Sequence, residues 1–242
     1  MRLLGHLVLI ALLYLHLGDS AEAQQSEANL GSSAKGAQTD ANIVTGLDVS
    51  SSINAEDAQI QLRGMALAIQ SPEILSAIQR GRHKRIGFSV FLWSDGGYPV
   101  VVAWRIIGSA EDAAAAAAQL TVPFEVVREA QTSGLTDLSR AIENGGALLK
   151  AAPFHSDRSV LNIVGNGEDN VGEGPQKARD ALVASGGEIN GVVIGDLPKI
   201  LAYYQTAVVG GPMAFVVPVK TPENLVDAMR RKFVTEIAMA LP

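Results

Sequence analysis

The stretch Ile43–Asp57, IVTGLDVSSSINAED, decides the fold of this chain. An apolar run of β-favouring residues ends at Asp48, three serines follow, and then a segment with helical spacing begins. The apolar run indicates a buried strand, while apolar residues at Ala58, Leu62 and Met65 indicate a helix packed on it. The stretch therefore predicts a strand–loop–helix unit with a polar loop at the end of the strand.

The rest of the chain alternates between short apolar runs and segments with helical periodicity. We predict strands over residues 42–49, 85–93, 99–107, 159–165, 188–195 and 213–219. We predict helices over residues 55–70, 109–120, 137–150, 175–185, 199–206 and 221–240. The turn-rich sequence SDGGY between the second and third strands indicates an antiparallel hairpin. The alternation favours one α/β domain with a mainly parallel sheet between helices.

Composition limits the classes of function. The chain has 242 residues, of which 48% are hydrophobic, enough for one domain with its own core. Its formal net charge of −6 disfavours binding to nucleic acid or to anionic membranes. There is no cysteine, which excludes disulfides, thiolate metal sites and cysteine nucleophiles.

The first 23 residues have the features of a signal peptide. The apolar segment Leu7–Leu15 is too short to span a bilayer, and Ala21–Ala23 places small residues at a cleavage site. A retained membrane anchor is the alternative. Residues 24–41 are polar and aperiodic and predict a flexible linker, so that residues 42–242 form the domain. We expect an exported protein, periplasmic or extracellular, with no membrane span after cleavage of the leader.

The polar loop after the first strand carries candidate metal ligands. Asp48, Ser50 and Ser52 have the spacing i, i+2, i+4, which puts all three on one side of an extended segment. One carboxylate and two hydroxyls are hard oxygen ligands, which suit Mg²⁺ or Mn²⁺. A serine-rich turn that caps the following helix is the alternative.

Two further polar loops are expected at the same edge of the sheet. Thr136 lies immediately before a predicted helix, and Asn166 immediately after a predicted buried strand. In α/β folds of this type ligands bind at the carboxyl ends of the strands. The three loops together therefore predict a binding site at that edge.

Asp-x-Ser-x-Ser in one loop, a threonine in a second and a polar residue closing a later strand resemble the metal-ion-dependent adhesion site (MIDAS) of von Willebrand factor A (vWA) domains. The resemblance runs from Ile43 to about Ala238 and implies the Rossmann-like vWA fold, with one antiparallel edge strand and helices on both faces. EILSAIQRGRHKRIGFSVFLWSDGG, GNGEDNVG and VVGGPMAFVVPVKTPENLVDAMRRKFVTEIA further resemble a family of secreted bacterial vWA-like proteins of unknown function.

The resemblance implies a role for each candidate residue. Ser50 and Ser52 would ligate the metal directly, and Thr136 would join them when a ligand is bound. Asp48 would act through water or as a hydrogen-bond acceptor behind the ligands. The third loop of such sites usually carries an aspartate, whereas this chain has Asn166 and so lacks one negative charge. Three acids are near enough in sequence to compensate: Asp137, Glu168 and Asp169.

We therefore expect a binding module, not an enzyme, which recognises a protein partner through Mg²⁺ or Mn²⁺, with an Asp or Glu of the partner completing the metal shell. A metal-free scaffold with a degenerate site is the alternative. A metal-dependent hydrolase is less favoured, because the chain beyond the leader has two histidines, His83 and His155, and no G-x-S-x-G motif.

The basic run Arg80–Arg85 is interpreted as a solvated loop, since the protein is acidic and expected to be exported. Glycine spacing and three acids argue against a dinucleotide site in GNGEDNVGEG.

Overall fold

The computed structural model describes residues 36–240. The predicted signal peptide, residues 1–23, and residues 24–35 of the predicted linker lie outside the described residues. The last residues of the predicted linker pack on the domain: the Thr39 backbone N–H donates to the His155 carbonyl at 2.9 Å, and Asp40 Oδ1 accepts from the His83 N–H at 2.8 Å. Thr39 and Asp40 are buried. The packed part of the chain therefore begins before residue 42, the predicted start of the domain.

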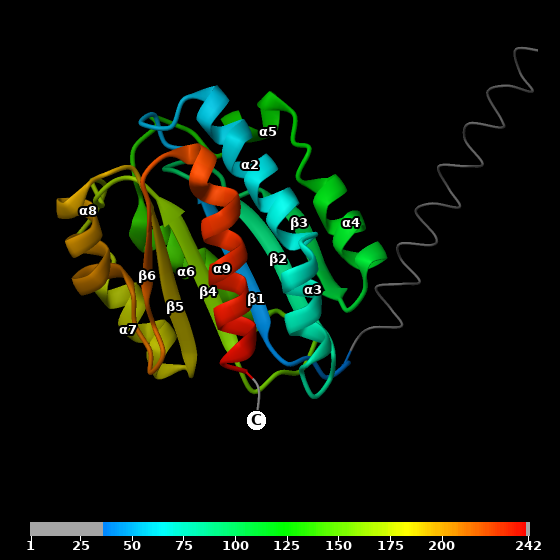
Figure 1. The fold of residues 1–242 in the computed structure, drawn as a ribbon. Helices are drawn as coiled ribbons and strands as arrows, with labels where there is room; N and C mark the ends of the chain where they lie inside the picture. The colour runs from blue at the N-terminus through cyan, green and yellow to red at the C-terminus, as the bar shows by residue number, and fades with distance from the viewer. Residues whose placement is uncertain (1–35, 241–242) are drawn as a thin grey trace, which may run out of the picture. The chain divides into compact units, whose positions relative to one another are not determined.

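A six-stranded sheet forms the centre of the domain, in the order β3–β2–β1–β4–β5–β6 (Figure 1). Its strands are β1 (Asn42–Asp48), β2 (Ile86–Trp93), β3 (Val100–Ile107), β4 (Ser159–Gly165), β5 (Gly187–Ile194) and β6 (Val216–Val219). Neighbouring strands are parallel except β2 and β3, which form an antiparallel pair at one edge. This confirms the predicted mainly parallel sheet with one antiparallel edge strand. Every residue of β1, β2 and β5 is buried, which explains their nearly continuous apolar sequences.

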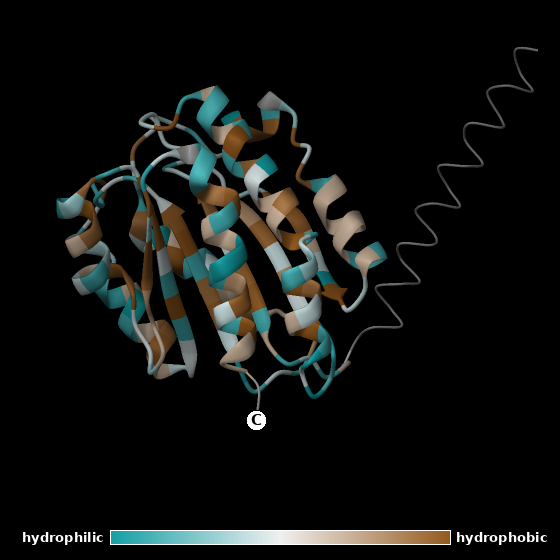
Figure 2. Ribbon diagram, in the orientation of Figure 1, coloured by the Kyte–Doolittle hydropathy of each residue, from teal (hydrophilic) through white to brown (hydrophobic). Residues whose placement is uncertain are grey.

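Helices cover both faces of the sheet, as predicted (Figure 1). The helical segments are α2 (Ala55–Ile69), α3 (Pro72–Gln79), α4 (Ala110–Gln119), α5 (Phe124–Glu129), α6 (Leu138–Lys150), α7 (Gln176–Ala184), α8 (Pro198–Tyr203), the π-helical η1 (Tyr204–Val208), the 3₁₀ turn η2 (Pro222–Asn224) and α9 (Leu225–Ala238). Apolar residues of α2, α3, α4 and α9 form the core on one face, and those of α6, α7 and η1 form it on the other. In Figure 2 the strands are mostly hydrophobic, whereas the helices mix hydrophobic and hydrophilic residues.

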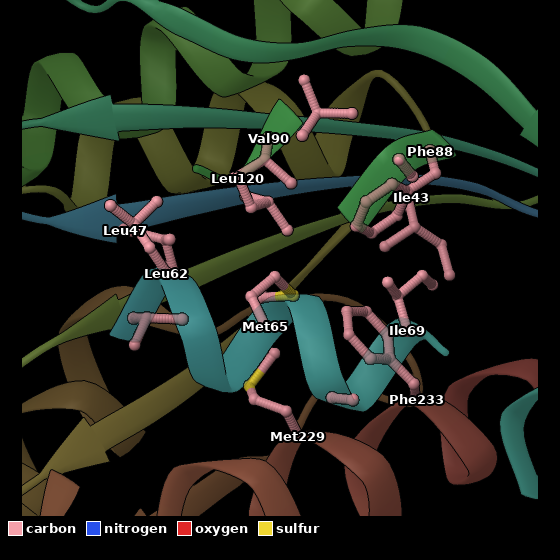
Figure 3. Packing of buried hydrophobic residues seen from close by; sticks show 14 of the residues in the cluster. Ile43, Leu47, Leu62, Met65, Ile69, Phe88, Val90, Leu120, Met229 and Phe233 are labelled. Carbon is pink, nitrogen blue, oxygen red and sulfur yellow. The ribbon is translucent and has the colours of Figure 1, made fainter. Parts of the chain in front are cut away.

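The core on the α2 and α9 face fixes the position of β1. Met65 of α2 packs beside Met229 and Phe233 of α9, and these side chains lie over Ile43 and Leu47 of β1 (Figure 3). All five are 0–1% exposed. Burying a side chain of this size contributes roughly 1.5–3 kcal/mol. The loop that follows β1 is therefore held by a strand and a helix that are both anchored in the core.

Four segments differ from the sequence predictions. Helices α3 and α5 were not predicted, although the N-cap Ser71 and Pro72 are typical of a helix start. Strand β6 is shorter than the predicted strand over residues 213–219. The predicted helix over residues 199–206 is α8 followed by the π-helical turn η1, because this part of the chain changes its hydrogen-bond pattern at Tyr204.

Candidate metal site

Three loops meet at the carboxyl edge of the parallel strands. We call residues 49–54 the first loop, residues 130–137 the second and residues 166–175 the third. Ser52 Oγ of the first loop donates to Asn166 Oδ1 of the third at 2.7 Å. The Ser51 backbone N–H donates to the Gly134 carbonyl of the second loop at 2.8 Å. The three predicted loops are thus joined to one another.

Asp48 is the last residue of β1 and is fully buried. Its Oδ1 accepts a hydrogen bond of 2.8 Å from the Ser50 backbone N–H. Its Oδ2 is buried and has no hydrogen-bond partner among the described residues. Burial raises the pKa of this carboxyl to about 6, although the hydrogen bond from Ser50 and the nearby Asn166 backbone N–H act in the opposite direction. A buried carboxylate without full hydrogen bonding is costly, so Asp48 is suited to a cation or a further donor.

A chain of oxygens leads from this buried carboxylate to the surface. Ser50 Oγ is buried and lies 3.1 Å from Ser52 Oγ, which in turn lies 2.7 Å from Asn166 Oδ1. Octahedral Mg²⁺ holds its ligands at roughly 2.1 Å, so neighbouring ligand oxygens lie about 3 Å apart. The oxygen separations in this chain match that spacing. These donor groups therefore fit a hard divalent cation.

Thr136 lies beside this chain of oxygens in the second loop. It is 5% exposed, and its Oγ1 lies 3.4 Å from the position that a β-carbon on Gly167 would take. Its backbone N–H donates to Asn170 Oδ1 at 2.8 Å, and the Asn170 N–H donates back to the Thr136 carbonyl at 3.0 Å. The threonine hydroxyl is thus placed next to the start of the third loop, one residue from Asn166.

The three acids considered as compensating charges have other contacts. Asp137 caps α6, its Oδ1 accepting from the Arg140 N–H at 2.9 Å. Asp169 Oδ1 accepts from the Leu138 N–H at 2.8 Å, and its Oδ2 accepts from the Gly172 N–H at 3.2 Å. Glu168 forms an ion pair of 3.0 Å with Lys199. Within residues 36–240 no group of three or more His, Asp or Glu side chains is arranged to hold a metal ion.

Asp95, two residues after the end of β2, was missed in the sequence and holds the second loop. Its carboxylate accepts from the backbone N–H groups of Thr132, Ser133 and Gly134 at 2.9–3.0 Å. The neighbouring Ser94 hydroxyl donates to the Leu135 carbonyl at 2.6 Å. The rule that placed Asp48 and Asn166, a polar residue at the carboxyl end of a buried strand, also identifies Asp95.

Exposed apolar side chains lie on the second and third loops and on the segment paired with the third loop. We call three of them, with exposed fractions of 40, 46 and 41%, the apolar rim: Leu135, Val171 and Leu197. Leu135 precedes Thr136 in the chain and Val171 follows Asn170, and these two neighbours are hydrogen-bonded to each other. The ion pair between Glu168 and Lys199 connects the third loop to the segment that carries Leu197. The apolar rim therefore follows loops that are bonded to one another.

A hollow of about 660 Å³ lies on the other side of the site. It is lined by Ser51 and Gly134 of the first and second loops and by Arg128 and Glu129 of α5. Both charged residues are exposed. The candidate site is thus set in a surface with a hollow on one side and the apolar rim on the other.

The strand order, the antiparallel edge pair and the Asp-x-Ser-x-Ser loop at the sheet edge define this protein as a vWA fold. Three solved structures agree. Proximal thread matrix protein 1 from the mussel byssus has a TM-score of 0.58 at 17% identity, covering 84% of this chain and 49% of that chain. Another structure of that protein, with a zinc-occupied MIDAS motif, has a TM-score of 0.56 at 17% identity and the same coverage. The pilus adhesin SpaC from Lactobacillus rhamnosus GG has a TM-score of 0.57 at 14% identity, covering 84% of this chain and 31% of that chain.

The chain belongs to the family described as "Protein of unknown function (DUF1194)", whose model matches residues 38–241. The vWA resemblance predicted from the sequence is therefore confirmed. The chain spans about half or less of the length of the solved relatives, and at these identities the likeness shows the fold alone. No curated protein matches the chain.

Proposed function

We propose that this protein is an exported binding module that recognises a protein partner through a divalent metal ion, Mg²⁺ or Mn²⁺. The observation that carries the proposal is that the side-chain oxygens of Ser50, Ser52 and Asn166 lie 3.1 and 2.7 Å apart in succession, as neighbouring ligands of such an ion do, next to the buried Asp48 carboxylate. Ser50 and Ser52 would bind the ion directly, and Thr136 would join them when the partner is bound. Asp48 and Asn166 would accept hydrogen bonds from water on the ion.

The charge of the site favours a carboxylate from the partner. Asp48 is the only acid among the five candidate residues, and the other four contribute neutral oxygens. An ion held in this way keeps much of its positive charge, and when bound it supplies an electrophilic position for an anionic ligand. An Asp or Glu side chain of the partner would complete the shell.

The apolar rim supports a protein as the partner. Leu135, Val171 and Leu197 together expose apolar surface next to a polar centre, and grouped exposed apolar side chains mark interaction sites. A protein segment that carries an acid between apolar side chains could contact both parts. A small inorganic anion would use only the polar part.

The solved relatives support the same class of function. One is a matrix protein of the mussel byssus and another is a pilus adhesin, and a metal occupies the MIDAS motif in one structure of the former. Export rests on the predicted signal peptide. The intact mass of the protein in the exported fraction would test cleavage of the leader, since a cleaved chain should have the mass of a chain that begins at Gln24.

Two other functions are considered. A metal-free scaffold is favoured by the Ser52–Asn166 hydrogen bond, which closes the site without an ion. A hydrolase is less favoured, because His83 and His155 contact residues that precede β1, at the opposite end of this strand from Asp48. A binding role needs no general base at the site.

Thermal melting and titration calorimetry with Mg²⁺, with Mn²⁺ and with chelator test the proposal. The protein should melt at a higher temperature with ion, because an ion that binds only the native state stabilises it by mass action. Ser50→Ala should remove most of this shift. Ser51→Ala is the matched control, because Ser51 is exposed and outside the chain of oxygens. Equal melting temperatures with either ion and with chelator would leave the metal-free scaffold as the function.

A further inference from the structure

Two buried oxygen atoms near the candidate site lack hydrogen-bond partners among the described residues: Asp48 Oδ2 and the Tyr204 hydroxyl. Both side chains are 0% exposed. Buried polar atoms are nearly always hydrogen-bonded, and an unsatisfied one costs roughly 1–3 kcal/mol. The two atoms are not hydrogen-bonded to each other, so together they mark a gap that one water molecule or a small side-chain rotation would bridge.

Gly165, at the end of β4, shows that the two atoms face the same space. A β-carbon on this residue would lie 2.5 Å from the Tyr204 hydroxyl oxygen and 2.9 Å from Asp48 Oδ2. Any other residue at this position would push a methyl or larger group between the two oxygens. The absence of a side chain on Gly165 thus leaves the hydroxyl and the carboxylate open to each other.

A second glycine lets the tyrosine ring reach that far. A β-carbon on Gly191 of β5 would lie 2.9 Å from Tyr204 Cδ1, closer than such contacts are found. The ring therefore lies across β5 and β4, where two strands lack side chains, and its hydroxyl arrives beside Asp48 of β1. On the other side, Trp93 closes the space, since its Cζ2 lies 3.1 Å from the same position on Gly165.

Tyr204 begins the π-helical turn η1 directly after α8. Single π-helical turns occur frequently at functional sites. The preceding Tyr203 also points to the site, because its hydroxyl accepts a hydrogen bond of 3.3 Å from the Asp169 N–H of the third loop. Consecutive tyrosines on one segment therefore reach β1 and the third loop.

We propose that Tyr204 is a positioning residue of the metal site: its hydroxyl serves Asp48 Oδ2 across the gap beside Gly165, through one water molecule or after a small rotation of the side chain, and holds the carboxylate with Oδ1 toward Ser50. This inference rests on the proposed function, since it assigns Tyr204 to the same site. Groups that hydrogen-bond to a metal ligand without contacting the metal orient that ligand, and their loss typically weakens metal binding roughly 10- to 100-fold. The segment α8–η1 thereby supports the metal centre from a distance of more than 150 residues along the chain.

The test compares Tyr204→Phe, which removes only the hydroxyl, with the control Thr206→Val in the same segment, whose hydroxyl bonds the Ala202 carbonyl and not the site. Calorimetric titration with Mg²⁺ and Mn²⁺ should give a dissociation constant about 10-fold higher for Tyr204→Phe and little change for Thr206→Val. A second measurement needs no metal. Urea unfolding in chelator of Tyr204→Phe, Asp48→Ala and the double variant forms a double-mutant cycle, and the midpoint shift caused by Tyr204→Phe should disappear when residue 48 is alanine.

The outcomes separate this inference from the proposed function. If the unmodified protein binds the ions and Tyr204→Phe binds them equally well, Tyr204 does not position Asp48, while the metal site stands. An additive cycle would also overturn the contact between the two residues. If the unmodified protein binds neither ion, the proposed metal function fails and the positioning role fails with it. A non-additive cycle would then show that the hydroxyl and the carboxylate are nevertheless partners in a metal-free domain.

Discussion

Ser52 Oγ donates a hydrogen bond of 2.7 Å to Asn166 Oδ1, joining the loop after β1 to the loop after β4 across the mouth of the candidate site. The amide of Asn166 is oriented by this contact, because its Nδ2 group lies 3.5 Å from the Ser52 carbonyl. An amide oxygen in this place can accept from a hydroxyl or from metal-bound water, but it adds no charge. The identity of residue 166 therefore sets the charge of the site more than its shape.

Asn166→Asp should tighten binding of Mg²⁺ and Mn²⁺. The substitution keeps the acceptor for Ser52 and adds a negative charge at the partly exposed mouth, so we expect a gain on the order of 1 kcal/mol. Titration calorimetry on both proteins would measure it. Asn170→Asp is the matched control, because Asn170 lies in the same loop and bonds Thr136 instead of Ser52. Equal gains in both variants would mean that general charge, not the position of residue 166, is responsible.

The strands and the edge that carries the site could be predicted from the sequence for a physical reason. β1, β2 and β5 are buried on both faces, and this produces apolar runs that are visible without an alignment. Once the strands are parallel, polar residues that follow them must meet at one edge, which is why Asp48 and Asn166 could be placed together. The short helices α3 and α5, of eight and six residues, were missed because so few residues show little periodicity.

The supporting contacts of the site could not be predicted in the same way. Asp137, Glu168 and Asp169 are near the site in sequence, but whether an acid faces a metal or caps a helix depends on its rotamer and on loop geometry. Tyr204 lies in a segment predicted as an ordinary helix, and its path over two glycines requires the register of β4 and β5. These contacts connect residues far apart in the chain, so local patterns contain no signal for them.

The metal-free protein should lose stability as the pH rises from about 4 to about 7. Burial raises the pKa of Asp48 from 3.8 to about 6, so between these values the native state holds a proton that the unfolded chain has lost. The stabilisation from the protonated carboxyl is complete at low pH and is lost as the pH passes 6, for a total of about 3 kcal/mol. Urea unfolding in chelator should show this loss in the unmodified protein and not in Asp48→Asn.

A bound metal ion should stabilise the protein more at high pH than at low pH. Because the ion competes with the proton for Asp48, the rise in melting temperature with Mn²⁺ should be largest above pH 6 and should diminish at pH 5. Melting curves at both pH values, with Mn²⁺ and with chelator, would measure it. An ion effect that is equal at both pH values would show that Asp48 is not coupled to the metal.

A buried ion pair between α9 and the sheet should contribute to the free energy of unfolding and not to metal binding. Lys232 and Glu236 of α9 are 0–1% exposed, and Lys232 Nζ contacts both Glu236 and Asn162 of β4. Lys232→Met leaves a buried carboxylate without its cation and should cost roughly 3–5 kcal/mol in urea unfolding. Arg230→Met, which breaks an exposed pair with Glu73, should cost less than about 1 kcal/mol.

The same pair offers an internal check. Replacing both residues, as in Lys232→Met with Glu236→Leu, removes the charge left unpaired and should cost less than the two single substitutions added together. Additive costs would mean that the two side chains do not act as a pair. The melting shift caused by Mg²⁺ should be unchanged in any of these variants that folds.

The apolar rim should contribute to partner binding without affecting the metal. Leu135→Ser, Val171→Ser and Leu197→Ser remove apolar surface at 40–46% exposed positions, so each should leave folding and the Mg²⁺ affinity nearly unchanged. If the partner covers these side chains, each substitution should cost roughly 1 kcal/mol of binding free energy, about a fivefold loss of affinity. Leu67→Ser is the matched control, since Leu67 is 52% exposed on α2 and outside the apolar rim.

The measurement needs a binder, which can be selected from a displayed peptide library on immobilised protein in Mg²⁺ and eluted with chelator. Selected peptides should contain an Asp or Glu next to bulky apolar residues, because the first would complete the metal shell and the second would cover the apolar rim. Surface plasmon resonance should then show weaker binding for the three rim variants, none for Ser50→Ala, and unchanged binding for Leu67→Ser. Peptides that bind the rim variants as tightly as the unmodified protein would place the partner elsewhere, with the hollow beside Ser51 and Arg128 as the next surface to mutate.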